Sequence, residues 1–263
     1  MNVGNILSLS FKYPFGDYKN LTIFSALFLL SVIMSVGFWI HNDILLKIGF
    51  VAVMLLFLIV PGYLISVIKE GCLESSNIPS LNIVKNIIDT LKLIVLNIVY
   101  MIIPILVFLA LTLGTGLSSV FTTGSIPLNF FSSLSITLII SFIVFLIFTL
   151  ISYVAMARFA YYGKLVGALN FKSVFGDIKK IGVLRLIGWY LLMAIILGII
   201  GRVSLLLLLV PYIGIIIYMC LVTPIISLIF YYSIGLIYSN VAGAEFDINA
   251  FERELMEFRI HKK

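Results

Sequence analysis

Long apolar runs separated by short polar segments dominate this chain. A helix needs about 20 apolar residues to cross the hydrocarbon core of a bilayer, where each backbone polar group must find its partner within the segment. The pattern therefore predicts an all-α integral membrane protein with six transmembrane helices. The predicted spans are Leu21–Ile40, Ile48–Ile68, Leu93–Leu113, Phe131–Ala155, Ile181–Ile200 and about Tyr212–Tyr238.

The last apolar run, Val203–Tyr238, is too long for one straight span. At about 1.5 Å per residue it would extend well beyond a core of roughly 30 Å. Pro211 and Gly214 mark a break, because proline removes a helix donor and clashes with the preceding turn. We expect Ser204–Val210 to form an interfacial or re-entrant lead into one sixth span. The alternative is two short spans, which would make seven.

A short pattern precedes each pair of spans. It reads LSFKYPFGDYKNL at Leu9–Leu21, LNFKSVFGDIKKI at Leu169–Ile181 and, more faintly, LNIVKNIIDTLKL at Leu81–Leu93. The first two copies share seven of thirteen positions. Internal repetition of this kind predicts one membrane domain, residues 1–244, built from three parallel helical hairpins. The repeat units are about 1–71, 72–163 and 164–244.

Each repeat unit is predicted to open with a cytoplasmic amphipathic segment. In the third unit Val174, Ile178 and Ile181 recur at helical spacing, opposite Lys172 and Lys179. Such helices lie in the headgroup plane, where lysine reaches anionic lipid. In the first unit a proline limits the helix to about residues 3–11. Residues 245–263 are predicted to form a cytoplasmic amphipathic tail.

Composition and charge place this domain in a membrane and orient it. Hydrophobic residues make up 62% of the chain and charged residues only 11%. All but two of the seventeen basic residues, Lys47 and Arg202, fall on the side of both predicted termini. The positive-inside rule then predicts a cell-membrane protein with cytoplasmic N- and C-termini. The net charge of +6 is explained by this topology, so nucleic acid is not an expected partner.

The repeated pattern carries one acid per unit, namely Asp17, Asp89 and Asp177. The structural interpretation is that these carboxylates stabilise helix N-termini or pair with Lys92 and Lys180 at helical spacing. The functional alternative is a ring of three acids that gates ions at the cytoplasmic mouth of a bundle. The candidate lipid-headgroup contacts are Arg158, Lys172, Lys179 and Lys180.

Catalytic and metal-binding chemistry is not expected. The middle of each predicted span lacks Asp, Glu, His and Lys, which are the usual marks of proton relays and ion coupling. The two histidines, His41 and His261, are predicted on opposite sides of the membrane, and the two cysteines suggest neither a disulfide nor a metal site. No cofactor is predicted, and the chain is expected not to be an enzyme.

Several motifs resemble a known family. The sequences YPFGDYK at Tyr13–Lys19, PGYLISVIKEG at Pro61–Gly71, NIP at Asn77–Pro79 and ARFAYYGKL at Ala157–Leu165 are similar to uncharacterised archaeal and bacterial membrane proteins of domain-of-unknown-function family 4013. That family resembles, distantly, the six-span membrane domain that accompanies some glycerophosphodiester phosphodiesterases. The resemblance implies a six-span fold and a lipid-facing role. It implies no catalytic residues, because the phosphodiesterase domain is absent from this sequence.

Three functions are compatible with these features. The favoured one is a non-enzymatic membrane protein that binds lipid, a protein partner or a second copy of itself, and supports membrane or envelope processes. The alternative is a small-solute or ion transporter or channel built on a pseudo-threefold bundle. An integral membrane enzyme with a cytoplasmic site is the third.

Overall fold

The computed structural model describes residues 2–114, 130–210 and 212–260, and these residues contain helices and no strands. The all-α prediction is therefore confirmed for the part of the chain that the structure describes. The helices, in chain order, are α1 (Val3–Lys12), η1 (Tyr13–Phe15), α2 (Tyr18–Leu27), α3 (Leu29–Trp39), α4 (Asp43–Cys72), α5 (Ile83–Gly114), α7 (Phe130–Tyr162), α8 (Leu165–Leu169), α9 (Phe171–Ile181), α10 (Val183–Ser204), η2 (Leu205–Leu209), α11 (Ile213–Ile217), η3 (Tyr218–Val222) and α12 (Thr223–Ile260).

Six of the described helical segments are long and apolar enough to cross a membrane. This agrees with six predicted spans rather than seven. The segments are Tyr18–Trp39, Asp43–Cys72, Ile83–Gly114, Leu134–Tyr162, Val183–Leu209 and Ile213–Gly243.

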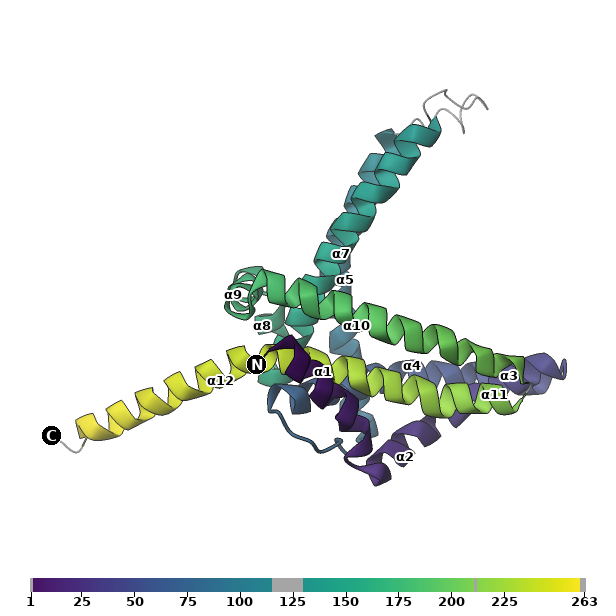
Figure 1. The fold of residues 1–263 in the computed structure, drawn as a ribbon, viewed down its shortest axis with the longest axis horizontal. Helices are drawn as coiled ribbons and strands as arrows, with labels where there is room; N and C mark the ends of the chain where they lie inside the picture. The colour runs from purple at the N-terminus through teal and green to yellow at the C-terminus, as the bar shows by residue number, and fades with distance from the viewer. Residues whose placement is uncertain (1, 115–129, 211, 261–263) are drawn as a thin grey trace.

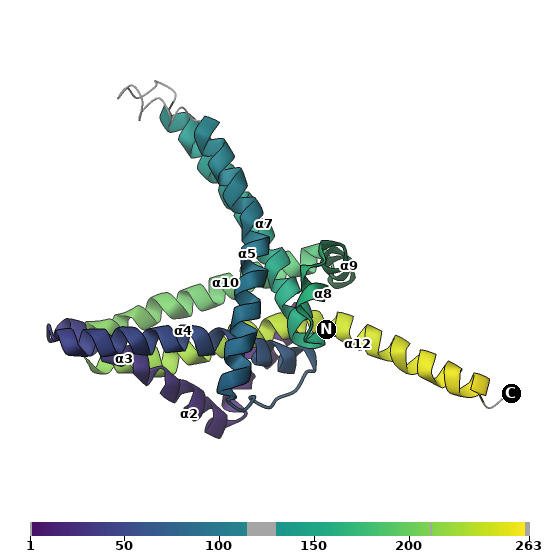
Figure 2. The same ribbon diagram turned by 180° about the vertical axis from the view of Figure 1, so that it is seen from behind.

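The spans form three pairs that meet at one end. From there the first pair (α3 and α4) and the third pair (α10 and α12) run together, and the second pair (α5 and α7) diverges from them (Figures 1 and 2). Figures 1 and 2 show α3, α4, α10, α11 and the first part of α12 running in one direction, while α5 and α7 rise together in another. The meeting end, which we call the junction, contains α1, α8, α9 and the connector 73–82. At the far end of the first and third pairs, the rings of Trp39 and Tyr212 lie 5.7 Å apart.

The junction also holds the buried core. The largest fully buried side chains come from segments far apart in the sequence, and they include Tyr63, Tyr100, Phe159, Trp189 and Tyr238. The outward parts of the spans expose apolar side chains instead, as expected where lipid rather than protein covers a helix. The fixed tertiary contacts are thus concentrated where the three pairs of spans meet.

The close crossing of α4 with α12 depends on two glycines. A Cβ atom on Gly71 of α4 would overlap the carbonyl oxygen of Tyr232, and one on Gly235 of α12 would overlap that of Ile68. Small residues let helix backbones approach closely, which is a common packing device in membranes. The crossing of α4 with α12 therefore leaves no room for a side chain at either glycine.

The three copies of the repeated pattern take three different shapes. In the first, Asp17 caps α2 after the short helices α1 and η1. In the second, the predicted amphipathic segment and the span form the single helix α5. In the third, α9 is a separate helix that ends at Gly182, whose φ of 93° favours glycine. Three equivalent hairpin repeats therefore stay a prediction from the sequence.

The end of the chain differs from the prediction at the lead into the sixth span. Ser204 closes α10, and the helix η2 follows it, so the predicted lead belongs to the fifth apolar segment, which ends at Leu209. The predicted break at Pro211 lies outside the described residues, and Tyr212 after it has a positive φ of 62°. The backbone of the predicted tail continues α12 as far as Ile260.

Candidate functional site

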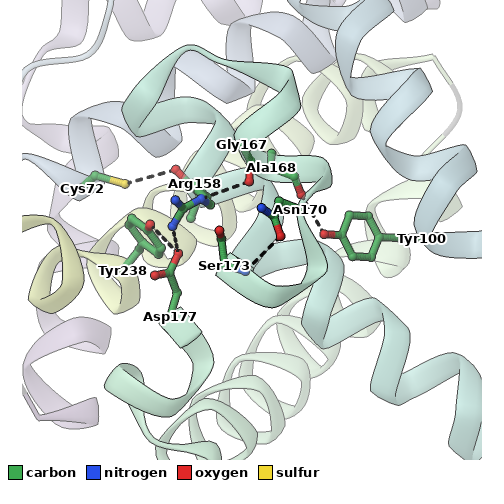
Figure 3. A network of polar contacts seen from close by, with 10 residues as sticks. Cys72, Tyr100, Arg158, Gly167, Ala168, Asn170, Ser173, Asp177 and Tyr238 are labelled. Carbon is green, nitrogen blue, oxygen red and sulfur yellow. Dashed lines mark hydrogen bonds and ion pairs between the residues drawn. The ribbon is translucent and has the colours of Figure 1, made fainter. Parts of the chain in front are cut away.

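A buried polar network joins three helices at the junction. Arg158 of α7 donates to Asp177 of α9, with 2.5 Å between Nη1 and Oδ2, and the hydroxyl of Tyr238 of α12 donates to the same oxygen at 2.8 Å. Figure 3 shows the guanidinium and the phenol converging on this carboxylate from two sides. The side chain of Asp177 is only 5% exposed. This carboxylate therefore holds α9 against the ends of two spans.

The segment between α7 and α9 is fixed by the same group of side chains. Gly163 ends α7 with a φ of 69°, and the Nε of Arg158 donates to the carbonyl of Gly167 at 3.1 Å. The hydroxyl of Tyr100 donates to the carbonyl of Ala168 at 2.7 Å (Figure 3). These bonds satisfy backbone carbonyls outside the long helices, where the helical pattern supplies no partner.

The connector between α4 and α5 is held in a comparable way. The hydroxyl of Tyr13 donates to the carbonyl of Asn77 at 3.1 Å, and that of Tyr63 donates to Pro79 at 3.0 Å. The hydroxyl of Tyr232 reaches the carbonyl of Ser75 at 3.0 Å. We call these three tyrosines the carbonyl clasp. The rings of Tyr13 and Tyr232 are stacked, with centroids 3.8 Å apart, and burial raises the pKa of Tyr13.

Beside the clasp, a basic hollow of about 800 Å³ opens between the ends of three spans. Lys69 comes from the end of α4, Lys85 and Lys92 from the first turns of α5, and Tyr161 and Tyr162 from the end of α7. Lys85 and Lys92 share one face of α5, because residues seven apart lie two turns along a helix. The hollow thus brings three lysine side chains together at the end of an otherwise apolar bundle.

Two of the three lysines contact neighbouring side chains in the hollow. The Nζ of Lys85 lies 3.1 Å from the hydroxyl of Ser66, and the Nζ of Lys92 lies 3.5 Å from Asp89. Lys92 also lies over the ring of Phe159, 5.8 Å from its centroid. Among the described residues that line the hollow, Asp89 supplies one carboxylate against three lysines, which gives three positive charges and one negative charge. The electrostatics of the hollow favour an anion.

The hollow is also apolar on one side. Val84 and Ile88 of α5 line it and are 69% and 47% exposed, respectively. Ile65 of α4 and Phe159 of α7 add further apolar wall. A ligand that fits this hollow has a charged part and a hydrocarbon part.

The structure gives the three repeated acids different roles. Asp17 caps α2 by accepting from the backbone N–H of Asn20 at 3.2 Å, and this hydrogen bond is the main cause of its lowered pKa. Asp89 pairs with Lys92, as the helical spacing predicts. Asp177 pairs with Arg158, so the pairing predicted between Asp177 and Lys180 is wrong.

The hydrogen bonds and ion pairs of the three acids involve other residues. Each has its own partners, and among the described residues no contact joins two of the three acids. The acidic ring at a bundle mouth therefore has no support in the contacts of the described chain. The structural interpretation holds most directly for Asp17, which is an N-cap, whereas Asp89 and Asp177 lie inside α5 and α9.

The four predicted headgroup contacts fall into two groups, exposed lysines and one arginine within the polar network. Lys172, Lys179 and Lys180 are exposed on α9, where they are free to meet lipid. Arg158 contacts Asp177, Gly167 and the ring of Tyr162, 4.9 Å from the ring centroid, and its side chain is 18% exposed. We therefore treat Arg158 as a residue of the junction rather than as part of a headgroup site.

Sequence reasoning missed Lys69, Lys85 and Lys92 as a group. One signal was available, because Lys85, Asp89 and Lys92 follow one another at helical spacing on one face of α5. Nothing in the sequence places Lys69 beside them. No group of three or more His, Cys, Asp or Glu residues able to hold a metal occurs among the described residues.

A search of curated proteins found no match to this chain, and neither did a search of solved structures. The expected kinship with the membrane domain of glycerophosphodiester phosphodiesterases therefore stays a prediction. A family model described as "Protein of unknown function (DUF4013)" matches residues 45–210, which is more than half of the chain and includes α5, α7, α8 and α9. The six apolar segments and this match together identify the chain as a member of the DUF4013 family of proteins of unknown function.

Proposed function

We propose that this protein is a non-enzymatic multi-pass membrane protein that binds the headgroup of an anionic phospholipid in the basic hollow. The observation that carries the proposal is the convergence of Lys69, Lys85 and Lys92 at the ends of three apolar helices. Basic pockets between transmembrane helices on the cytoplasmic side of a membrane are suited to acidic headgroups. The proposed partner is lipid and not nucleic acid.

The apolar wall of the hollow favours a lipid over a small soluble anion. Val84 and Ile88 are exposed directly beside the lysines, and burying such side chains contributes about 25 cal/mol per Å² of apolar surface. An acyl chain or glycerol backbone can cover them while the headgroup meets Lys69 and Lys85. A free anion would leave this wall exposed to water.

The orientation that we propose places the junction in the cytoplasm of a cell-membrane protein. The inner leaflet carries anionic lipids, which attract lysines near the membrane surface by about 1 kcal/mol each. Lys172, Lys179 and Lys180 on α9 would add to this attraction without entering the hollow. The long-range attraction and the specific binding would then come from two separate sets of lysines.

Native mass spectrometry of the detergent-purified protein tests the proposal by recording the lipids that it retains. The test variant replaces Lys69, Lys85 and Lys92 with Gln. The matched control replaces Lys172, Lys179 and Lys180 with Gln, so both variants lose three positive charges. We expect the first variant to lose anionic lipid and the control to keep it, with thermal unfolding showing that both remain folded.

Two results would count against the proposal. If the α9 variant loses the lipid and the hollow variant keeps it, the headgroup site lies on α9. If the wild-type protein retains no anionic lipid, headgroup binding is not its function, and flux assays in proteoliposomes become the next measurement.

A further inference from the structure

The charge of the basic hollow narrows the class of headgroup that it can bind. We propose that the hollow selects a phospholipid whose headgroup ends in a phosphomonoester, with two negative charges on one phosphate. This inference rests on the proposed function, because it concerns the same hollow. It goes further by naming the chemistry that distinguishes one anionic lipid from another.

The first argument is charge balance. Lys92 lies 3.5 Å from Asp89, so one of the three ammonium groups is offset by a carboxylate on its own helix. Lys69 and Lys85 have no acidic partner within salt-bridge distance among the described residues. The hollow therefore presents two uncompensated positive charges. A phosphodiester carries one negative charge, whereas a phosphomonoester carries about 1.5 to 2 at neutral pH.

The second argument is the supply of hydrogen-bond donors. The terminal phosphate of a monoester has three strong acceptor oxygens, which need several donors in a small space. Each lysine ammonium has three donor hydrogens, and Lys85 directs one toward Ser66. Tyr162 lines the hollow, and its buried hydroxyl has no hydrogen-bond partner among the described residues. The hollow thus offers donors from α4, α5 and α7 to one phosphate.

The start of α5 adds a third contribution. Asn82 lines the hollow and accepts from the backbone N–H of Lys85 at 3.1 Å. The other first N–H groups of a helix have no partner within the helix, and the helix dipole makes this end positive. The first turn of α5, which is the positive end of this 32-residue helix, therefore lines the hollow next to the lysines that carry the main argument.

The charge of the ligand supplies a test that depends on pH. The titratable side chains that line the hollow are Lys69 from α4, Lys85, Asp89 and Lys92 from α5, and Tyr161 and Tyr162 from α7. As the pH falls through about 6, a phosphomonoester takes up a proton and loses its second negative charge. A phosphodiester has no such step in this range. Binding of a phosphomonoester should therefore weaken between about pH 8 and about pH 5, with a phosphodiester lipid in the same sample as the reference.

The test uses nanodiscs that contain equal amounts of phosphatidic acid, phosphatidylglycerol and diphosphatidylglycerol in a zwitterionic lipid. The full-length protein is extracted with its bound lipids, which are quantified by mass spectrometry at about pH 8 and about pH 5. We expect phosphatidic acid to be enriched about tenfold or more over phosphatidylglycerol at the higher pH, because a charge-assisted hydrogen bond favours tight binding by such factors. The enrichment should fall at the lower pH.

Variants separate specific binding from loss of fold. Replacing Lys69 and Lys85 with Gln should abolish the enrichment, whereas replacing both with Arg should retain it. The matched control replaces Lys179 and Lys180 with Gln and should behave as the wild type. An excess of inorganic phosphate distinguishes the two sources of the ligand. If the lipid stays bound in excess phosphate, the ligand is a phospholipid. If phosphate displaces the lipid, the hollow binds free phosphate and the proposal of a lipid ligand is wrong.

The outcomes also distinguish this inference from the proposed function. If all three anionic lipids are enriched equally and all depend on Lys69 and Lys85, headgroup binding stands and selection of a phosphomonoester is wrong. Preference for diphosphatidylglycerol also contradicts selection of a phosphomonoester, since that lipid carries its two charges on separate phosphodiesters. If no lipid depends on these lysines, both proposals fail.

Discussion

Arg158 of α7 and Asp177 of α9 form a buried ion pair, with Arg158 Nη1 2.5 Å from Asp177 Oδ2 (Figure 3). The pair joins the end of one apolar span to a short helix that carries three exposed lysines. A buried ion pair contributes little net stability, but removing one partner leaves an uncompensated charge. The position of α9 at the junction therefore depends on both residues being present.

Replacing Asp177 with Ala should strongly destabilise the junction. The partly buried guanidinium of Arg158 would lose its carboxylate, which costs up to about 3–5 kcal/mol, the range for a fully buried pair. Replacing Asp89 with Ala should cost at most about 1 kcal/mol, because its partner Lys92 is 39% exposed. Thermal unfolding of the purified variants in detergent compares the two.

Equal losses at both positions would contradict this division of roles. Asn variants of the acids test the transporter alternative, because a flux protein with an acidic ring should lose uptake when any of the three acids is replaced. We expect Asp17→Asn and Asp89→Asn to leave the folded protein intact. Loss of flux in both variants would favour the acidic ring over the structural interpretation.

Replacing Gly71 or Gly235 with Ala should disrupt the crossing of α4 with α12. The added Cβ atom would overlap the carbonyl oxygen of Tyr232 in the first variant and that of Ile68 in the second. Forcing extra atoms into a tight contact typically costs about 1–3 kcal/mol, and these contacts are with backbone, which cannot rotate away. Thermal unfolding and the yield of folded protein measure the effect.

A glycine elsewhere supplies the control for this prediction. A Cβ atom on Gly198 of α10 would meet nothing within 4 Å. Gly198→Ala should be neutral or stabilise the helix by up to about 1 kcal/mol, because alanine favours a helix more than glycine does. If Gly71→Ala is as stable as Gly198→Ala, the backbones of α4 and α12 do not approach as closely as described.

The carbonyl clasp should protect the connector 73–82 from proteolysis. Changing Tyr13, Tyr63 or Tyr232 to Phe removes one hydroxyl and keeps the ring, so each variant should lose about 0.5–1.5 kcal/mol of stability. Cleavage after Glu74 by a glutamate-specific protease should become faster. Tyr18→Phe is the control, since Tyr18 is 69% exposed. Cleavage that is unchanged in all three variants would show that the hydroxyls do not hold the connector.

The proposed orientation predicts which residues can be labelled from outside the cell. With Cys72 and Cys220 replaced, a cysteine at His41 should react with a membrane-impermeant maleimide in intact cells. Cysteines at Ser76 and Lys172 should react only after the membrane is opened. All three positions are exposed, so access to the reagent decides the result. Labelling of the cysteine at position 76 or 172 in intact cells would show that the termini are not in the cytoplasm.

The local prediction was most accurate where one segment contains all the necessary information. The helix expected at about residues 3–11 is α1, which ends at Lys12, and Pro14, the proline expected to limit it, lies in η1. The third copy of the pattern contains the helix α9, which buries Val174, Ile178 and Ile181 and exposes Lys179, while its location at a membrane surface stays a prediction. The cap at Asp17 follows from the same local chemistry, since a carboxylate readily accepts from a free N–H at a helix start.

Prediction failed where two distant segments compete for one side chain. Asp177 and Lys180 have the spacing of a helical ion pair, yet the carboxylate contacts Arg158 of α7 and Tyr238 of α12. A buried guanidinium offers a stronger partner than an exposed lysine, because surface pairs are weakened by water and salt. The second repeat shows the same limit, since α5 continues through the boundary that its faint pattern suggested.

The sequence by itself determined that this chain is helical, membrane-embedded and organised around six apolar segments, because hydropathy and helix length are properties of contiguous residues. Only the tertiary structure decided which ends of the spans meet, and hence that Lys69 joins Lys85 and Lys92 in one hollow. The physical reason is that lipid covers the outward faces of all the spans alike. Helix association depends instead on close glycine contacts and buried polar pairs, which link residues far apart in the chain.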